Sequence, residues 1–284
     1  MKPAWSVILF TTLAGAGQGL FLAAFAGGGR PEMVLVALVL AAAGLVASFF
    51  HLGHPERAWR SAAMWRTSWL SREVIVLPLF MALVLVYGLL QWAGRPEQAL
   101  VVGWMAAVAC VALFVCTGMI YACLRFLQEW HSPLTVLNIA LLGCASGLTL
   151  AAAFEPRYAL AAILATALAA AGRIASLVRN ARLKPRSSLQ SAIGIKHPRI
   201  AQKAQGAIAG SFNTREFFHG HGPLALRNVK WLFIAAAFAV PAALLLAGLP
   251  AAAFVVQYCG LLAERWFFFA QANHPQNLYY QVVS

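Results

Sequence analysis

Long runs of apolar residues alternate with short polar connections along most of the 284-residue chain. Each run is close to the roughly 20 residues that an α-helix needs to cross the hydrocarbon core of a bilayer. Because lipid satisfies no backbone polar group, such runs must be helical. The pattern therefore predicts an all-α, polytopic membrane protein with eight transmembrane helices. They cover about residues 4–27, 32–53, 73–93, 98–121, 134–154, 157–178, 229–247 and 250–270.

Short connections between successive helices favour antiparallel neighbours, so we expect two four-helix bundles. The first comprises residues 1–131, and the second comprises residues 132–284 with a long polar loop over 179–228. Two small-residue motifs, Gly15-x-x-x-Gly19 and Gly143-x-x-x-Gly147, are typical of helices that pack closely together.

Composition agrees with a membrane location and limits the chemistry of the chain. Hydrophobic residues make up 62% of it and charged residues only 10%, and the mean hydropathy is +0.75. The five cysteines all lie in or at the ends of apolar runs, and none forms a C-x-x-C pair. We therefore expect neither an iron–sulfur cluster nor a structural zinc site in this chain.

The net charge of +13 is distributed unevenly between the two sides of the predicted bundle. Only Arg30, Arg95 and Arg157 fall in connections on the side opposite the N-terminus, whereas nearly all other Lys and Arg residues fall on the N-terminal side. The positive-inside rule places that basic side, with both termini, in the cytoplasm of a bacterium with the chain in its cytoplasmic membrane. Anionic lipid and a docked protein explain the charge better than nucleic acid does.

A histidine and a glutamate flank the connection between the second and third runs. His51 lies at the end of one run and Glu73 begins the next, at the level where lipid meets water. Ionisable groups at that depth cost free energy and are candidates for function. A quinone headgroup needs a hydrogen-bond donor and a proton acceptor; imidazole can be either, and a carboxyl group at an apolar boundary can exchange protons. We therefore expect a quinone between them.

The same connection supplies the other residues of this predicted quinone site. It is rich in Arg and Trp, a composition typical of segments that lie at the membrane surface. The additional candidates are Arg57, Arg66, Trp69 and Arg72. The alternative is structural: His51 caps the second helix, and Glu73 complements the dipole at the start of the third.

The remaining polar groups suggest other roles. All seven histidines fall on the basic side, and none lies inside a run as an axial haem ligand would, so we do not expect a haem; a single haem near that side, with one histidine ligand, is the remaining alternative. Glu264 and Arg265 lie inside the last run, where we expect interhelical charge pairing with separate partners, because adjacent residues on a helix point in different directions.

The long loop contains aromatic residues that a solvated tether does not need. They suggest packing onto a partner protein or back onto the bundle. The candidate docking residues are Arg215, Glu216, Phe217, Phe218 and His219.

Over its full length the chain resembles the membrane-anchor subunits of the dimethyl sulfoxide reductase type. The segments that carry the resemblance are His51-Leu52-Gly53-His54-Pro55-Glu56-Arg57-Ala58 and Ser71-Arg72-Glu73. In that family the matching histidine and glutamate are associated with the quinol site. The resemblance implies eight helices and two partners, a molybdopterin catalytic subunit and a ferredoxin-like iron–sulfur subunit. It also implies that molybdenum and iron–sulfur clusters belong to those partners.

Within the family, the chain is most similar to the anchors of quinone-linked sulfite dehydrogenases. Three segments carry this closer likeness, Trp65 to Glu73, Gly210 to Gly220, and Glu264 to Phe269 with His274-Pro275-Gln276-Asn277. It implies cytoplasmic catalytic subunits that oxidise sulfite and pass electrons to a quinone. The long loop is an elaboration over simpler members of the family.

Three alternatives to this function remain open from the sequence. The same anchor can run in reverse, oxidising menaquinol while a sulfoxide is reduced. It can be a structural anchor without a quinone site. A secondary transporter would carry broken helices and polar groups near the membrane midplane, and the helix interiors here hold few such groups.

Overall fold

The computed structural model describes residues 1–28, 30–50, 53–201 and 217–278, and every regular element within them is a helix. The predicted all-α class is confirmed. The long helices are α1 (Trp5–Ala26), α2 (Pro31–Phe49), α3 (Trp69–Trp92), α4 (Pro96–Ala122), α5 (Pro133–Phe154), α6 (Ala159–Ala181), α9 (Pro223–Ile234) continuing through the π-helical turn η3 (Ala235–Ala239) into α10 (Val240–Leu246), and α11 (Pro250–Ala270). The short ones are η1 (Pro55–Met64), η2 (Pro156–Tyr158), α7 (Leu189–Ile193) and η4 (Pro275–Leu278).

Seven stretches of the described chain are long and apolar enough to cross a membrane. They correspond to the first seven predicted spans. The eighth predicted run forms α11, whose bounds match the prediction, but it is not among the seven. Gln257, Glu264 and Arg265 make α11 less apolar than the other long helices. Its role as a span stays a prediction.

Two predicted boundaries were wrong at the ends of these helices. The third helix begins at Trp69 rather than at Glu73, because the Ser68 side chain caps it by accepting from the Ser71 backbone N–H at 3.3 Å. The predicted long loop is shorter than expected: α6 continues to Ala181, α9 begins at Pro223, and α7 lies between them.

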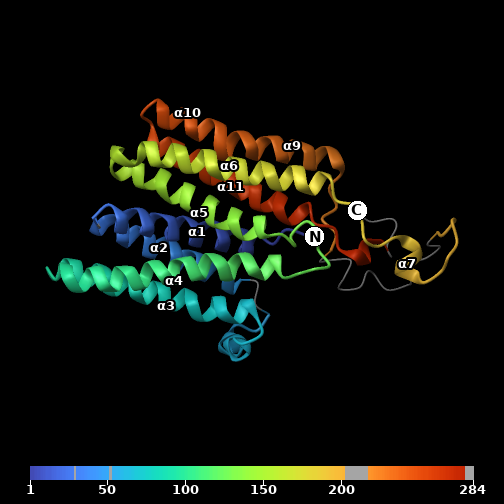
Figure 1. The fold of residues 1–284 in the computed structure, drawn as a ribbon, viewed down its shortest axis with the longest axis horizontal. Coiled ribbons are helices and arrows are strands. Elements are labelled where there is room, and N and C mark those ends of the chain that lie inside the picture. The colour runs from blue at the N-terminus through green and yellow to red at the C-terminus, as the bar shows by residue number, and fades with distance from the viewer. Residues whose placement is uncertain (29, 51–52, 202–216, 279–284) are drawn as a thin grey trace.

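The long helices lie side by side, with α1 and α5 near the centre and α3 and α10 toward opposite edges (Figure 1). Helix α1 packs against α2 and α5, α3 packs against α4, and α5 packs against α6. The main hydrophobic core runs from Ile8 in α1 to Ala272 just after α11. It thus includes residues from both predicted halves of the chain.

The two glycine motifs face each other across the contact between α1 and α5. A Cβ atom added to Gly19 would lie 2.9 Å from the Cα atom of Cys144, and one added to Gly147 would lie 2.5 Å from the Cα atom of Gly19. Side chains at these two positions would force the backbones apart. The predicted close helix contact is confirmed, and the structure identifies the two motifs as each other's partners.

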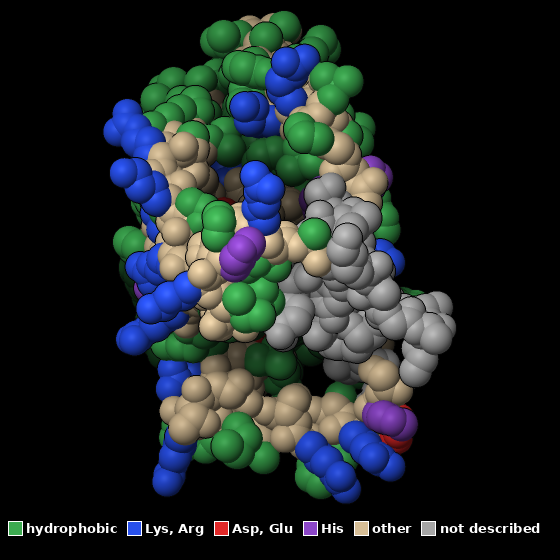
Figure 2. All heavy atoms as spheres, turned by 90° about the vertical axis from the view of Figure 1, so that its right-hand side faces the viewer, with side chains coloured by type: hydrophobic (Ala, Val, Ile, Leu, Met, Phe, Trp, Pro, Cys, Tyr) green, Lys and Arg blue, Asp and Glu red, His purple; other side chains and the backbone are tan. Residues whose placement is uncertain are grey.

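The N-terminus and the end of α11 lie on one side of the bundle. Helix α1 begins and α11 ends at the right of Figure 1, where η1 and α7 also lie. Figure 2, which looks onto that end, shows Lys and Arg side chains spread across it and few Asp or Glu side chains. The helices therefore present a strongly basic face at this end, which we call the basic end.

Candidate functional site

The connection that carries the predicted site is folded as a short helix beneath α3. η1 covers Pro55–Met64, and a tight turn leads from it to the N-cap of α3 at Ser68. His51, the predicted histidine of the quinone site, lies outside the described residues. The other predicted residues of the site, including Glu73, are all described.

Glu73 lies one turn inside α3, and its side chain is buried against α4. Only 5% of the residue is exposed. The Thr117 hydroxyl of α4 donates a hydrogen bond to its Oε1 atom. Among the described residues, Oε2 has no hydrogen-bond partner and neither oxygen forms an ion pair. A membrane-buried carboxyl group with one neutral partner costs free energy, so a role as a mere helix cap is a poor explanation for it.

Arg72 points away from Glu73 and fastens the turn before α3. Its Nε atom donates to the Trp65 carbonyl at 2.9 Å, and its Nη2 atom donates to the Arg66 carbonyl at 2.8 Å. The guanidinium also lies over the Trp69 ring, 4.2 Å from the ring centroid. Arg72 and Trp69 therefore fix where the connection meets α3, which positions Glu73.

The other two predicted arginines do not converge on Glu73. Arg57 is exposed and pairs with the neighbouring Glu56, Nε to Oε1, at 3.7 Å. Arg66 is exposed and lies over the Trp65 ring at 5.5 Å. Both lie on the exposed surface of the connection rather than at the buried carboxyl group.

The described part of the predicted docking segment folds back onto the bundle. Phe218 is buried, and the Phe217 ring stacks on His274 with 3.8 Å between the centroids. His219 is half-buried, and burial lowers its pKa below the usual value. Arg215 and Glu216 lie outside the described residues. The expectation that the aromatic residues pack onto the bundle holds for these two phenylalanines.

A buried ion cluster joins α6 to α11. Arg173 of α6 is 2% exposed, and its Nε atom lies 2.6 Å from Oε1 of the fully buried Glu264. Arg265 lies 2.5 Å from the other oxygen of the same carboxylate. The predicted interhelical charge pairing is confirmed, but the expectation of separate partners for Glu264 and Arg265 was wrong, because one carboxylate accepts from both arginines.

A polar cavity of about 10 Å³ lies beside this cluster, and the sequence analysis did not predict it. Three buried atoms of residues that line it, Asn138 Oδ1, Arg173 Nη2 and Gln271 Nε2, lack a hydrogen-bond partner among the described residues. One acceptor and two donors around so small a space match the usual surroundings of a buried water. These residues are far apart in sequence, so no local motif marks them.

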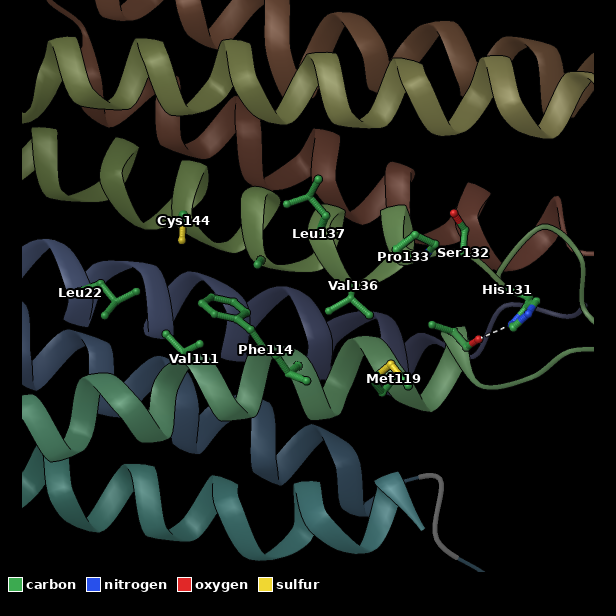
Figure 3. A pocket seen from close by; sticks show the side chains of 13 residues that line it. Leu22, Val111, Phe114, Met119, His131, Ser132, Pro133, Val136, Leu137 and Cys144 are labelled. Carbon is green, nitrogen blue, oxygen red and sulfur yellow. Dashed lines mark hydrogen bonds between the residues drawn. The ribbon is translucent and has the colours of Figure 1, made fainter. Parts of the chain in front are cut away.

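The largest cavity is elsewhere, on the lipid side of α4 and α5. It has a volume of about 660 Å³, and its lining is almost entirely apolar, with His131 and Ser132 at one end (Figure 3). Thr117, which holds Glu73, is not among its lining residues. No cluster of three or more potential metal-ligating side chains occurs within the described parts of the chain.

Residues 1–197 match the family described as DMSO reductase anchor subunit (DmsC). The chain belongs to the DMSO reductase anchor subunit family. It is also similar to an anchor-sized relative from Allochromatium vinosum, a subunit of that organism's sulfite dehydrogenase, with 50% identity over an alignment that covers all of both chains. The resemblance inferred from the sequence is therefore confirmed.

Membership explains several features of this anchor subunit at once. An anchor subunit belongs to an oxidoreductase complex with catalytic partner subunits, and its apolar helices hold that complex in a membrane. The basic end is then the surface that offers charge and exposed aromatic residues to lipid and protein. Trp59, for example, is 71% exposed on η1.

Proposed function

We propose that this anchor subunit binds a quinone at the basic end of α3 and passes electrons to it from an iron–sulfur partner. The observation that carries the proposal is the buried carboxyl group of Glu73, with one hydroxyl partner from Thr117 and no ion pair among the described residues. Such a group can hold or release a proton next to a lipid-soluble substrate. His51, beyond the described residues, would bind the other quinone oxygen.

Reduction of a quinone to a quinol consumes two electrons and two protons. Glu73 would deliver one proton through its Oε2 atom and be reprotonated from the aqueous side of the connection. Arg72 and Trp69 would keep the turn in place while the headgroup enters from the lipid. Arg57 and Arg66 would hold lipid phosphates at the surface rather than contact the quinone.

The complex that this anchor serves is proposed to oxidise sulfite to sulfate. The support is the 50% identity to a sulfite dehydrogenase subunit over the full length of both chains. Sulfite would be oxidised at a molybdopterin subunit, and a ferredoxin-like iron–sulfur subunit would dock on the basic end. Reverse flow, from menaquinol to a substrate such as a sulfoxide, is the second candidate, because the family is described by its DMSO reductase members.

We place the anchor in the bacterial cytoplasmic membrane with the basic end in the cytoplasm. The charge distribution supports this orientation through the positive-inside rule. In this arrangement α11 is the eighth span, its ion cluster is shielded by α5 and α6, and the two four-helix bundles pack together through α1, α4 and α5. Both termini then lie in the cytoplasm.

The test compares two electron acceptors in the intact complex. Glu73→Gln keeps the size of the side chain but cannot carry the proton, so quinone-linked sulfite oxidation should fall by about 100-fold or more. Sulfite oxidation with a soluble dye that accepts electrons directly from the partner subunits should stay normal. Thr117→Ser, which keeps the hydroxyl group, is the matched control and should retain quinone-linked activity.

Equal quinone-linked activity in Glu73→Gln and in the unaltered complex would refute the site. Loss of both activities would indicate that the substitution prevents assembly. A quantitative immunoblot of the partner subunits in the membrane separates that result from a true loss of quinone reduction.

A further inference from the structure

The groove between α4 and α5 has the shape of a binding site for a long apolar molecule. It is about 660 Å³ in volume, within the range usual for small-molecule sites. It extends along α5 from Cys144 to Ser132, which is about 18 Å at 1.5 Å per helical residue. Its apolar lining includes Leu22, Val111, Phe114, Met119, Val136 and Leu137 (Figure 3).

His131 gives the end of the groove nearest the basic end a defined hydrogen-bonding character. Its Nδ1 atom lies 2.7 Å from the Ala122 carbonyl oxygen. Because a carbonyl only accepts, Nδ1 carries the proton, and the lone pair of the neutral ring lies on Nε2. Nε2 has no hydrogen-bond partner among the described residues. Arg179 holds the His131 backbone in place by donating from Nη2 to its carbonyl at 2.9 Å.

The chemistry of the groove selects among the molecules that a bilayer contains. No Lys, Arg, Asp or Glu of the described chain lines it, so an anionic phospholipid headgroup would find no cation there. A neutral headgroup that donates a hydrogen bond suits the lone pair on His131 Nε2. A quinol hydroxyl can donate such a bond, whereas the carbonyl oxygens of the oxidised quinone cannot.

We propose that this groove is a second carrier site, which binds the reduced form, a quinol, with its isoprenoid tail along α5 and one hydroxyl on His131. The inference rests on the proposed function, because it assumes that the anchor exchanges quinones with the bilayer. The site is separate from Glu73: Thr117 contacts that carboxyl group, while Val111, Val115 and Met119 of the same helix line the groove.

The separation of the two sites has a simple consequence for turnover. A quinone reduced at Glu73 and a quinol held at His131 would not compete for the same residues. The groove would retain product beside the complex without blocking the entry of the next quinone. Occupancy should therefore depend on the redox state of the carrier, which a general lipid-filled groove would not show.

The test uses an azido-ubiquinone probe with the purified complex in lipid nanodiscs, once oxidised and once kept reduced by dithionite. After photolysis, the reduced probe should label peptides from α4 and α5, between residues 111 and 144. His131→Asn keeps a donor for the Ala122 carbonyl but removes the Nε2 acceptor. It should weaken binding of the reduced probe by about three- to tenfold and leave the oxidised probe unaffected.

A second variant closes the groove without touching its polar end. Ala140→Trp fills the middle of the groove and should reduce labelling of α4 and α5 by the reduced probe to background. Leu160→Trp is the matched control, because Leu160 is an exposed apolar position on α6 and does not line the groove. It should leave labelling unchanged.

Labelling of α4 and α5 that is equal for the two redox forms, or absent, would overturn the inference. So would binding of the reduced probe that is unchanged in His131→Asn. Each of these results leaves the proposed function standing if Glu73→Gln still loses quinone-linked activity. Conversely, normal activity in Glu73→Gln together with labelling of the groove would refute the Glu73 site alone.

Discussion

At the scale of single residues, one carboxylate compensates two buried arginines. Glu264 accepts from Arg173 across the interface between α6 and α11 and from its own neighbour, Arg265. A pair of charges removed from water is stable only when each charge keeps a partner. Glu264 is therefore the residue on which this part of the core depends.

We predict that Glu264→Gln destabilises the anchor by about 3–5 kcal/mol, because two buried guanidinium groups lose their counter-charge. Unfolding of the purified complex in a detergent titration measures the change. Glu155→Gln is the control, since the ion pair of Glu155 with Arg157 lies at the surface with the arginine half-exposed; it should cost about 1 kcal/mol or less. Equal effects of the two substitutions would contradict the role given to Glu264.

A second residue-scale prediction concerns pH. Burial lowers the pKa of His219 and of His274 below the usual histidine value. The unfolded segment then binds protons more readily than the folded one, so the stabilisation is complete above the ordinary pKa of about 6.5 and is lost as the pH falls below it. Hydrogen exchange at residues 217–221, corrected for intrinsic rates, should increase between about pH 7.5 and about pH 5.5.

The matched variants for this pH dependence are His219→Gln and His274→Gln, which remove the titrating rings. Their exchange should vary less with pH than that of the unaltered chain, while exchange within α5 should not vary in either. A dependence that persists unchanged in the double variant would show that other groups cause it.

At the scale of helices, the contact between α1 and α5 depends on two glycines that have no room for a side chain. We predict that Gly19→Ala or Gly147→Ala destabilises the anchor by about 1–3 kcal/mol, because the backbones must separate. Gly15→Ala is the control from the same motif, since its added Cβ would meet Gly143 at an ordinary 3.5 Å. The same detergent titration should rank Gly15→Ala nearest to the unaltered chain.

The sequence predicts the helices well because each apolar run carries its own signal. It marks Gly19 and Gly147 by spacing, but which motifs meet depends on the order of helices in space. It finds Glu73 from its depth, yet its partner Thr117 lies 44 residues away. The groove at His131 is lined by ordinary apolar residues of two helices, so only their arrangement reveals it.

Boundaries were predicted less well than helices, for a local reason. The third run starts at Glu73 in hydropathy, but the Ser68 cap starts α3 four residues earlier. That single turn moves the carboxyl group from the end of the helix to its interior. Hydropathy alone cannot see a cap, and the burial of Glu73 follows from it.

At the scale of the whole molecule, the account requires the basic end to face the cytoplasm. Lys184→Cys, exposed near α7, and Ala93→Cys, exposed after α3, lie at opposite ends of the bundle. In intact spheroplasts, a maleimide that does not cross membranes should label Ala93→Cys only. Labelling of Lys184→Cys should require permeabilised cells.

Exposed native cysteines would obscure that experiment, so Cys123 and Cys259 are first replaced by serine. Labelling of Lys184→Cys in intact spheroplasts would reverse the orientation. It would also place the docking surface for the partner subunits outside the cytoplasm, as an exported enzyme requires.

The most direct test of the central claim, that Glu73 serves quinone reduction, is a single-turnover measurement. The iron–sulfur clusters of the purified complex are first reduced with sulfite and then mixed rapidly with a soluble short-chain quinone. Reoxidation of the clusters, followed optically, should be slower in Glu73→Gln than in Thr117→Ser by about 100-fold or more. Equal reoxidation rates in the two variants would contradict the account.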